Sequence, residues 1–230
     1  MNYENIVEKI ERNNITNIIT NDIDAWNSKR NKINKKIYNK LWLVESQHIV
    51  CGPLGTEPNE YPIIIKPIIN LYGMSRSFKK LMSKKDYKEN QIDGCFWMPY
   101  YDGTQYTIDL VLNCGKIIGV YALESKPNMN GTFKYHKYNP SYILSDSKRN
   151  FIETNFSDYS GPMNIEIIDD VIIEGHLRFN GDMYLYDSEF LKTVSSIIDN
   201  DNDNDKILTN IENFYLFPYF VSSNFNTKIL

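Results

Sequence analysis

The fold is decided by one stretch, residues 159–178, which runs Tyr-Ser-Gly-Pro-Met-Asn-Ile-Glu-Ile-Ile-Asp-Asp-Val-Ile-Ile-Glu-Gly-His-Leu-Arg. Two runs rich in Ile flank Asp169 and Asp170, and a pair of Asp residues favours a tight turn. The stretch therefore predicts an antiparallel hairpin that turns at this pair. We expect the chemistry of the protein to lie on this hairpin.

One face of the predicted hairpin is polar. Side chains of a strand alternate between its two faces, so residues two apart share a face. The polar face carries Glu174, His176 and Arg178 on a strand over 171–178, and Asn164 and Glu166 on its partner. The opposite face carries Val171, Ile173 and Leu177 on the second strand, and Ile165 and Ile167 on the first.

Such a polar face has two interpretations. A pair of carboxylates can hold Mg²⁺, and an Arg guanidinium suits phosphate. The solvent face of an antiparallel sheet also carries ordinary polar residues that have no further role. The hairpin alone leaves both interpretations open.

Length and composition indicate a globular protein. The chain has 230 residues, of which 42% are hydrophobic and 13% aromatic, enough for one large domain or two small lobes. Its 17 Tyr and its many Asn and Ile residues are typical of an AT-rich genome, such as that of a large DNA virus or a protist.

The net charge of −4 argues against nucleic acid as a partner of the whole chain. Basic residues nevertheless gather in two stretches, 29–40 and 76–88, and acidic residues gather over 199–205. Such runs most often form solvated helix faces. Association with nucleic acid through the two basic stretches stays open as an alternative.

The cellular setting is predicted from cysteine usage and hydropathy. Cys51, Cys95 and Cys114 are widely spaced and odd in number, which favours a reducing environment. The first residues lack the basic and apolar regions of a signal peptide, and no apolar run approaches the roughly 20 residues that span a bilayer. We therefore expect an intracellular, cytoplasmic protein without a membrane partner, in the host cytoplasm if the gene is viral.

The N-terminal quarter predicts a basic helix followed by a strand. Asp22 or Asp24 could cap a helix that runs to about Lys40. Residues 41–50 are apolar and typical of a strand.

An Ile-rich run over 61–67 predicts a buried strand, from whose end Lys66 emerges. Residues 71–77 follow, with one Gly and two Ser. A turn of this composition can lay backbone N–H groups over a phosphate.

The middle of the chain predicts a β-meander over 94–120, with the Asp-Gly pair at 102–103 as a hairpin turn. On its middle strand Asp109 lies between Ile108 and Leu110, which makes it a candidate for a buried, paired carboxylate. Residues 125–140 are rich in Gly, Pro, Asn and Tyr, and predict a long irregular loop. His136 lies within that predicted loop, so we expect it to be a surface residue.

An acidic segment over 201–212 resembles the calcium loop of an EF-hand in part. Asp residues stand at the first, third and fifth positions of that loop and Glu212 at the last. Lys206 stands where the loop requires Gly. We therefore expect a surface loop that follows a helix ending near Ile198.

Four pieces of the chain, in this order, resemble the ATP-grasp superfamily. They are Ile65-Lys66-Pro67, Gly73-Met74-Ser75, Tyr100-Tyr101-Asp102-Gly103 with Tyr106-Thr107-Ile108-Asp109, and Glu174-Gly175-His176-Leu177-Arg178. The resemblance covers about residues 40–190. Its specificity lies in the order of the pieces and not in any single one.

The resemblance implies an α+β fold with two small lobes of antiparallel sheets and flanking helices, which clasp ATP. It divides the chain into a helical, basic N-terminal segment (1–40), an N-terminal lobe (41–93), a C-terminal lobe (94–198), and an acidic loop with an extended C-terminal tail (199–230). The superfamily typically joins a carboxylate to an amine through an acyl-phosphate, with ATP and Mg²⁺. The implied partners are thus a nucleotide and a small-molecule or peptide carboxylate.

The resemblance also implies a set of site residues. Lys66 matches the Lys that contacts the α- and β-phosphates, and Arg178 matches the Arg that steadies phosphate or substrate; together they are the implied catalytic residues. The implied metal ligands are Glu166, Glu174 and His176. The implied nucleotide-binding residues are Lys66, Gly73, Met74, Ser75, Met98 and Tyr100.

The chain departs from the superfamily's pattern at three places. Met98-Pro99 stands where an acidic hinge usually binds adenine and ribose, and His176 stands where Asn is usual. Gly73 is the one Gly in a loop that usually has several. These departures keep a second hypothesis open, a protein of this fold that binds a ligand and has lost catalysis.

Overall fold

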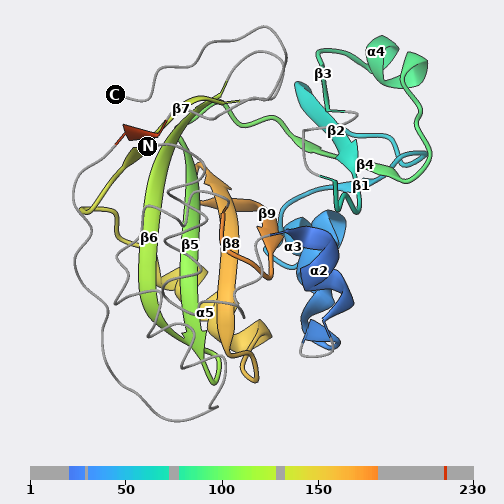
Figure 1. The fold of residues 1–230 in the computed structure, drawn as a ribbon. Coiled ribbons are helices and arrows are strands. Elements are labelled where there is room, and N and C mark those ends of the chain that lie inside the picture. The colour runs from blue at the N-terminus through green and yellow to red at the C-terminus, as the bar shows by residue number, and fades with distance from the viewer. Residues whose placement is uncertain (1–20, 29–30, 73–77, 128–132, 181–214, 217–230) are drawn as a thin grey trace, which may run out of the picture.

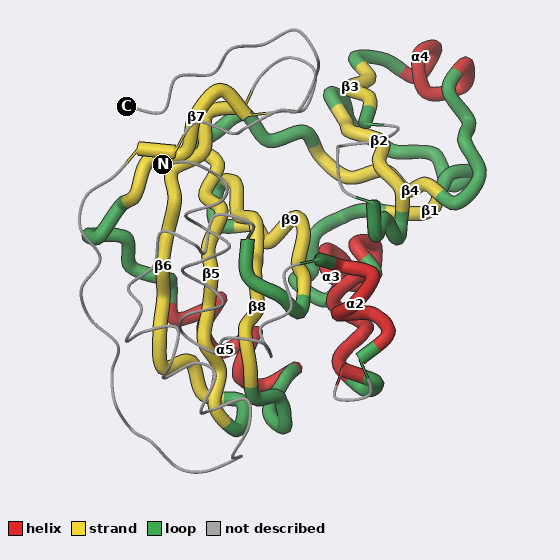
Figure 2. The backbone as a smooth tube through the Cα atoms, in the orientation of Figure 1, coloured by secondary structure: helices red, strands yellow, loops and turns green. Residues whose placement is uncertain are grey.

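Two antiparallel β-sheets and several short helices make up the computed structural model of the chain, which describes residues 21–28, 31–72, 78–127, 133–180 and 215–216. A four-stranded sheet lies beside a six-stranded sheet (Figure 1). Figure 2 shows that helices flank both of them. The arrangement confirms the predicted α+β class with two antiparallel sheets.

The small sheet is built around the predicted Ile-rich strand. Its strand order is β1-β4-β2-β3, with β1 at Gly52–Pro53, β2 at Ile63–Pro67, β3 at Lys79–Leu81 and β4 at Cys95–Pro99. One face packs on α4 (Lys84–Glu89), where Tyr87 joins Ile63, Ile65 and Trp97 in a core. The strand predicted over 61–67 is confirmed because both of its faces are buried.

The large sheet contains the hairpin. Its strand order is β10-β7-β6-β5-β8-β9, with β5 at Gln105–Asn113, β6 at Lys116–Pro127, β7 at Phe133–Tyr138, β8 at Gly161–Ile168, β9 at Val171–His176 and β10 at Tyr215–Leu216. At the β8–β9 turn Asp169 and Asp170 have φ angles of 50° and 58°, which a tight turn between strands requires. The predicted hairpin is confirmed.

A β-bulge in this hairpin changes the apolar side of β9. The register shifts just before Ile167, so that Ile172 lies opposite it. Ile172 and Leu177 therefore enter the core of the large sheet, whereas Val171 and Ile173 pack with residues of β2 and β4. The prediction that Val171, Ile173 and Leu177 share one face is wrong for this reason.

Helices pack on one face and one edge of the large sheet. They are α2 (Asp22–Asn27), the 3-10 helix η2 (Asn34–Tyr38), α3 (Lys40–Glu45) and α5 (Asp146–Asn155). Ile152 and Phe156 of the α5 region share a core with Ile108 and Leu110 of β5. At the edge, η2 and α3 contact β9.

The N-terminal helix and strand predictions are wrong. Asn21 caps α2 and the helix ends at Asn27, so it does not run to Lys40. Residues 41–50 form no strand, because Asn39 caps α3 there and Leu43 and Val44 are buried as one helical face. Tertiary burial overrides the strand preference of this apolar run.

The predicted meander is wrong in its first half, because β4 pairs with β1 and β2 and not with β5. Its second half is confirmed, because β5 pairs antiparallel with β6; β5 also pairs with β8. Residues 100–104 therefore link two sheets, and the Asp-Gly pair at 102–103 is no hairpin turn. By strand pairing the small sheet extends to Pro99, beyond the boundary expected at 93 and 94. The irregular loop expected over 125–140 contains β7, and α5 had no counterpart among the predicted elements.

Several predictions lie outside the described residues. They concern the loop residues Gly73, Met74 and Ser75, the helix ending near Ile198, and the segment 201–212. Among the helices of the described residues, none is long and apolar enough to cross a membrane.

Candidate functional site

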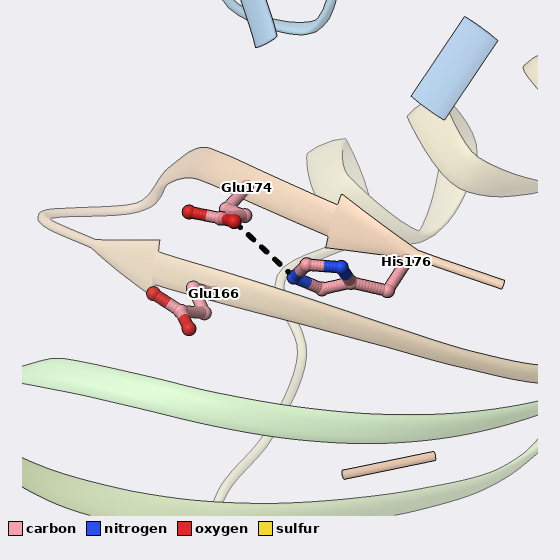
Figure 3. A group of neighbouring side chains, drawn as sticks. All are labelled: Glu166, Glu174 and His176. Atoms are coloured by element: carbon pink, nitrogen blue, oxygen red, sulfur yellow. Dashed lines mark ion pairs between the residues drawn. The ribbon is translucent and has the colours of Figure 1, made fainter. Parts of the chain in front are cut away.

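The three predicted metal ligands come together on the β8–β9 hairpin. Glu166 on β8 lies opposite Glu174 on β9, and His176 follows two residues later on the same face. One ligand atom from each lies within 4.8 Å of the others. Figure 3 shows the three side chains gathered across the two strands, with the His176 ring directed at Glu174. We call Glu166 and Glu174 the acid pair.

Two buried lysines accompany the acid pair. Lys40, the first residue of α3, places Nζ 2.7 Å from Glu174 Oε1. Lys66 on β2 donates from Nζ to the backbone carbonyl of Ile173 at 2.6 Å. Lys66 is only 8% exposed, so the prediction that it emerges from the core is wrong. Its ammonium instead joins the small sheet to β9.

The acid pair is electrostatically asymmetric. Burial raises the pKa of Glu166, and the charge of Glu174 raises it further. Burial would also raise the pKa of Glu174, but Lys40 and His176 hold it well below its usual value. Gln105 donates from Nε2 to Glu166 Oε2 at 2.9 Å. Glu174 is therefore the firmly ionised member, and Glu166 accepts a proton more readily.

Burial, together with the charge of Lys40, lowers the pKa of Lys66 to about 8. Most Lys66 side chains are nevertheless charged at neutral pH, since the pKa stays above it. The site thus keeps a fixed cation on the strand from the small sheet.

A further carboxylate, that of Asp22 on α2, contacts His176 and Arg178 at the end of the hairpin. Its Oδ1 accepts from Arg178 Nε at 2.7 Å and lies 2.9 Å from His176 Nδ1, while Oδ2 accepts from Arg178 NH2 at 2.9 Å. Burial would raise the pKa of Asp22, but hydrogen bonds and charges of His176 and Arg178 lower it to about 2. Arg178, expected to contact phosphate, is held in a two-point ion pair with Asp22.

Of the three predicted ligands, the two carboxylates fit Mg²⁺ and His176 does not. Mg²⁺ prefers oxygen ligands, which Glu166 and Glu174 supply. Burial and the charge of Arg178 lower the pKa of His176, but its hydrogen bonds to Asp22 and Glu174 raise it overall. With both ring nitrogens directed at carboxylates, the imidazole is set up as a donor and not as a metal ligand.

The predicted nucleotide-binding residues Met98 and Tyr100, in β4 and just after it, are engaged in other contacts. Met98 is 1% exposed and packs in an apolar core with Val44, Ile64 and Phe96. Tyr100 follows β4, and its ring lies under Lys80 Nζ at 3.5 Å from the centroid. The structure therefore places Met98 in the contact between small sheet and β9.

A polar row continues across the same face of the large sheet. Asp109 is buried, as predicted, and accepts from Asn164 Nδ2 at 2.7 Å. Further along, Ser125 Oγ lies 3.0 Å from Thr107 Oγ1 and 2.7 Å from His136 Nδ1. Burial lowers the pKa of His136 to about 4, so the interpretation of this residue as a surface histidine is wrong.

The first basic stretch takes part in packing. Lys35 Nζ lies 5.0 Å from the Trp26 ring centroid, and Lys36 Nζ lies 5.2 Å from the ring centroids of Trp42 and Phe156. Lys40 is engaged with Glu174. These cations are thus not a simple solvated helix face.

Sequence reasoning missed two residues of the site, Asp22 and Lys40. From the sequence, Asp22 is a candidate helix cap and Lys40 is one member of a basic run. Their contacts join segments far apart in the chain, so no local spacing indicates them. Hydrophobic periodicity could not have found either.

Comparisons with known proteins give structural matches alone. No family model matches the chain, and no curated protein matches it. An L-amino acid ligase from Bacillus licheniformis is similar over 72% of this chain and 48% of its own, with 14% identity and a TM-score of 0.53.

Two further matches were solved with nucleotide. The biotin carboxylase domain of a Hydrogenobacter thermophilus 2-oxoglutarate carboxylase, in complex with MgADP, ADP and bicarbonate, matches over 74% of this chain and 47% of its own, with 13% identity and a TM-score of 0.56. An N5-carboxyaminoimidazole synthetase from Staphylococcus aureus, complexed with ADP, matches over 70% and 51%, with 13% identity and a TM-score of 0.53.

The chain spans about half the length of the solved structures that it matches. Their likeness to this chain is one of backbone arrangement, since identity is 13% to 14%. These structures are ATP-grasp proteins, and the resemblance in the sequence led to the same superfamily. The chain therefore has the ATP-grasp fold, in a divergent form.

Proposed function

We propose that the chain binds ATP with Mg²⁺ between its two sheets and uses it to join a carboxylate to an amine. The observation that carries this proposal is the placement of Lys66 from the small sheet against β9, beside the acid pair. Phosphoryl transfer depends on positioning and on cations around the phosphates more than on covalent catalysis by the protein. Similar structures that hold ADP or MgADP support the choice of nucleotide.

The proposed reaction has two steps. A carboxylate oxygen of the substrate, a small molecule or a peptide, attacks the γ-phosphorus of ATP, and ADP leaves. The amine then attacks the acyl carbon, phosphate leaves, and the amine loses a proton. Both leaving groups are phosphate oxyanions, so the chain's task is to neutralise charge and exclude water.

In this proposal Lys66 contacts the phosphates, and Arg178 stabilises charge on the transferring group. Glu166 and Glu174 would hold Mg²⁺, which neutralises phosphate charge when bound. Arg178 must keep its orientation, and the Asp22 ion pair supplies that constraint. We propose that the chain forms two lobes that clasp the nucleotide, with their boundary after Pro99. β4, which ends there, pairs in the small sheet, whereas the next strand, β5, pairs in the large sheet.

A second candidate is a binding protein of this fold without catalysis. It is favoured by the ion pair of Lys40 with Glu174 and by that of Asp22 with Arg178, because both engage groups that catalysis would use. The apolar packing of Met98, in place of an acidic hinge, also favours it.

The test combines ATP binding with ATP turnover in the presence of mixed amino acids and short peptides. We expect Lys66→Ala to abolish binding and Glu174→Gln to abolish ADP formation. Lys79→Ala is the matched control, because Lys79 lies on the neighbouring strand β3 and is exposed. Turnover that survives in both site variants contradicts the ligase proposal, and binding without any turnover selects the second candidate.

A further inference from the structure

Lys40 contacts a carboxylate oxygen of the acid pair. Its Nζ lies 2.7 Å from Glu174 Oε1, and His176 Nε2 lies 3.4 Å from the same oxygen. Two hydrogen-bond donors thus converge on the firmly ionised member of the acid pair. A divalent cation bound to that oxygen would lie within a few ångströms of both donors.

The backbone of Lys40 is fixed. Its N–H donates to the carbonyl of Ile68 at 2.8 Å, and the Asn39 side chain caps α3 immediately before it. The Lys40 side chain is 7% exposed. The ammonium is therefore a built-in feature of the site and not a mobile surface charge.

Cationic groups already match the carboxylates around the acid pair. Its two carboxylates face two ammonium groups, those of Lys40 and Lys66, and the imidazole of His176, whose pKa is raised, adds a further donor to Glu174. Asp22 and Arg178 neutralise each other beside them. A divalent cation entering alone would add two uncompensated positive charges, which repulsion at short range opposes strongly.

We propose that Lys40 is an internal counter-ion that excludes free divalent cations from the acid pair. A cation then enters only with an anionic ligand that restores the balance. This inference concerns the same site as the proposed function. The entry of a cation together with an anionic ligand rests on that function, whereas the exclusion of free cations by Lys40 does not.

The test measures Mn²⁺ binding without nucleotide, by the loss of the free Mn²⁺ signal in electron paramagnetic resonance. We expect no stoichiometric binding by the wild type at millimolar Mn²⁺. Lys40→Met should bind one Mn²⁺ at least about tenfold more tightly, since one like charge a few ångströms away is removed. Adding Glu174→Gln to that variant should abolish the gain.

Lys36→Met is the matched control, because Lys36 lies over the rings of Trp42 and Phe156 and not at the acid pair. It should behave as the wild type does. Lys40→Gln provides a second neutral variant if Lys40→Met does not fold. Mn²⁺ should also raise the unfolding temperature of a folded Lys40 variant but not that of the wild type.

Wild-type protein that binds Mn²⁺ as tightly as the Lys40 variants overturns the inference. So does a folded Lys40→Met or Lys40→Gln protein that binds no more tightly than the wild type. No nucleotide enters this assay, so either failure leaves the proposed ATP binding standing. Conversely, if the protein does not bind ATP, replacing Lys40 can still tighten Mn²⁺ binding.

Discussion

Replacing Asp22 with Asn should destabilise the protein through the end of the hairpin. The fall in the pKa of Asp22 from 3.8 to about 2 corresponds to a net stabilisation of its ionised form by about 2.5 kcal/mol, which remains after the cost of burial is offset by His176 and Arg178. Removing one partner also leaves a buried cation uncompensated, and such losses reach about 3 to 5 kcal/mol. We expect Asp22→Asn to lower the free energy of unfolding by about 2 to 4 kcal/mol at neutral pH.

The assay is urea denaturation followed by tryptophan fluorescence. Because the folded-state pKa of Asp22 lies below its unfolded value, the contribution is present above about pH 4 and is lost as the pH falls through about 2. The difference between wild type and variant should shrink accordingly. Asp24→Asn, an exposed acid on the same helix, should cost less than about 1 kcal/mol. A loss at Asp22 no larger than that at Asp24 would show that the ion pair of Asp22 with His176 and Arg178 does not stabilise the fold.

Three further predictions concern stability. Gly115→Ala should cost at least about 2 kcal/mol in denaturant unfolding, since Gly115 has a φ of +76° and an added Cβ would lie 2.3 Å from the Cα of Ser157. Phe156→Ala should lower the free energy of unfolding by about 3 to 5 kcal/mol and lower the melting temperature, because its fully buried ring leaves a cavity. His136, with a pKa of about 4 in the folded state, should destabilise the protein by about 3 kcal/mol as the pH falls from about 6.5 to about 4. His136→Gln should lack that loss when urea titrations at the two pH values are compared.

The hairpin was predictable because all of its signals are local. Two Ile-rich runs and the Asp169–Asp170 turn specify the strands and their pairing, and alternation places Glu166 beside Glu174. The bulge was not predictable, because it arises from how Ile172 and Ile173 divide between two cores. Period-2 reasoning assumes a regular strand.

Elements whose identity depends on distant partners were predicted poorly. β4 and β5 are adjacent in sequence and belong to different sheets, although an Asp-Gly pair lies between them. The 41–50 run is apolar enough for a strand, yet its α3 portion is helical because Leu43 and Val44 bury one helical face. Strand β7 was missed because its residues resemble a polar loop.

The sequence indicated that the acid pair and Lys66 belong to one candidate site. It did not indicate which charged groups neutralise them. Side-chain spacing could place Glu174 and His176 on one face. It could not show that Lys40 from α3 and Asp22 from α2 neutralise them, since those contacts join segments far apart in sequence. The resemblance to a family implied roles for Lys66 and Arg178. The structure revealed Lys40 and Asp22 as the counter-ions of Glu174 and Arg178.

We have proposed that this chain, with its divergent ATP-grasp fold, binds ATP at Lys66. Calorimetric titration of the wild-type chain with ATP and Mg²⁺, with Lys66→Ala and Lys79→Ala measured alongside, tests that binding. We predict one bound ATP per chain for the wild type and for Lys79→Ala, and none for Lys66→Ala. No heat of binding in the wild type, or binding that Lys66→Ala leaves unchanged, would contradict the claim.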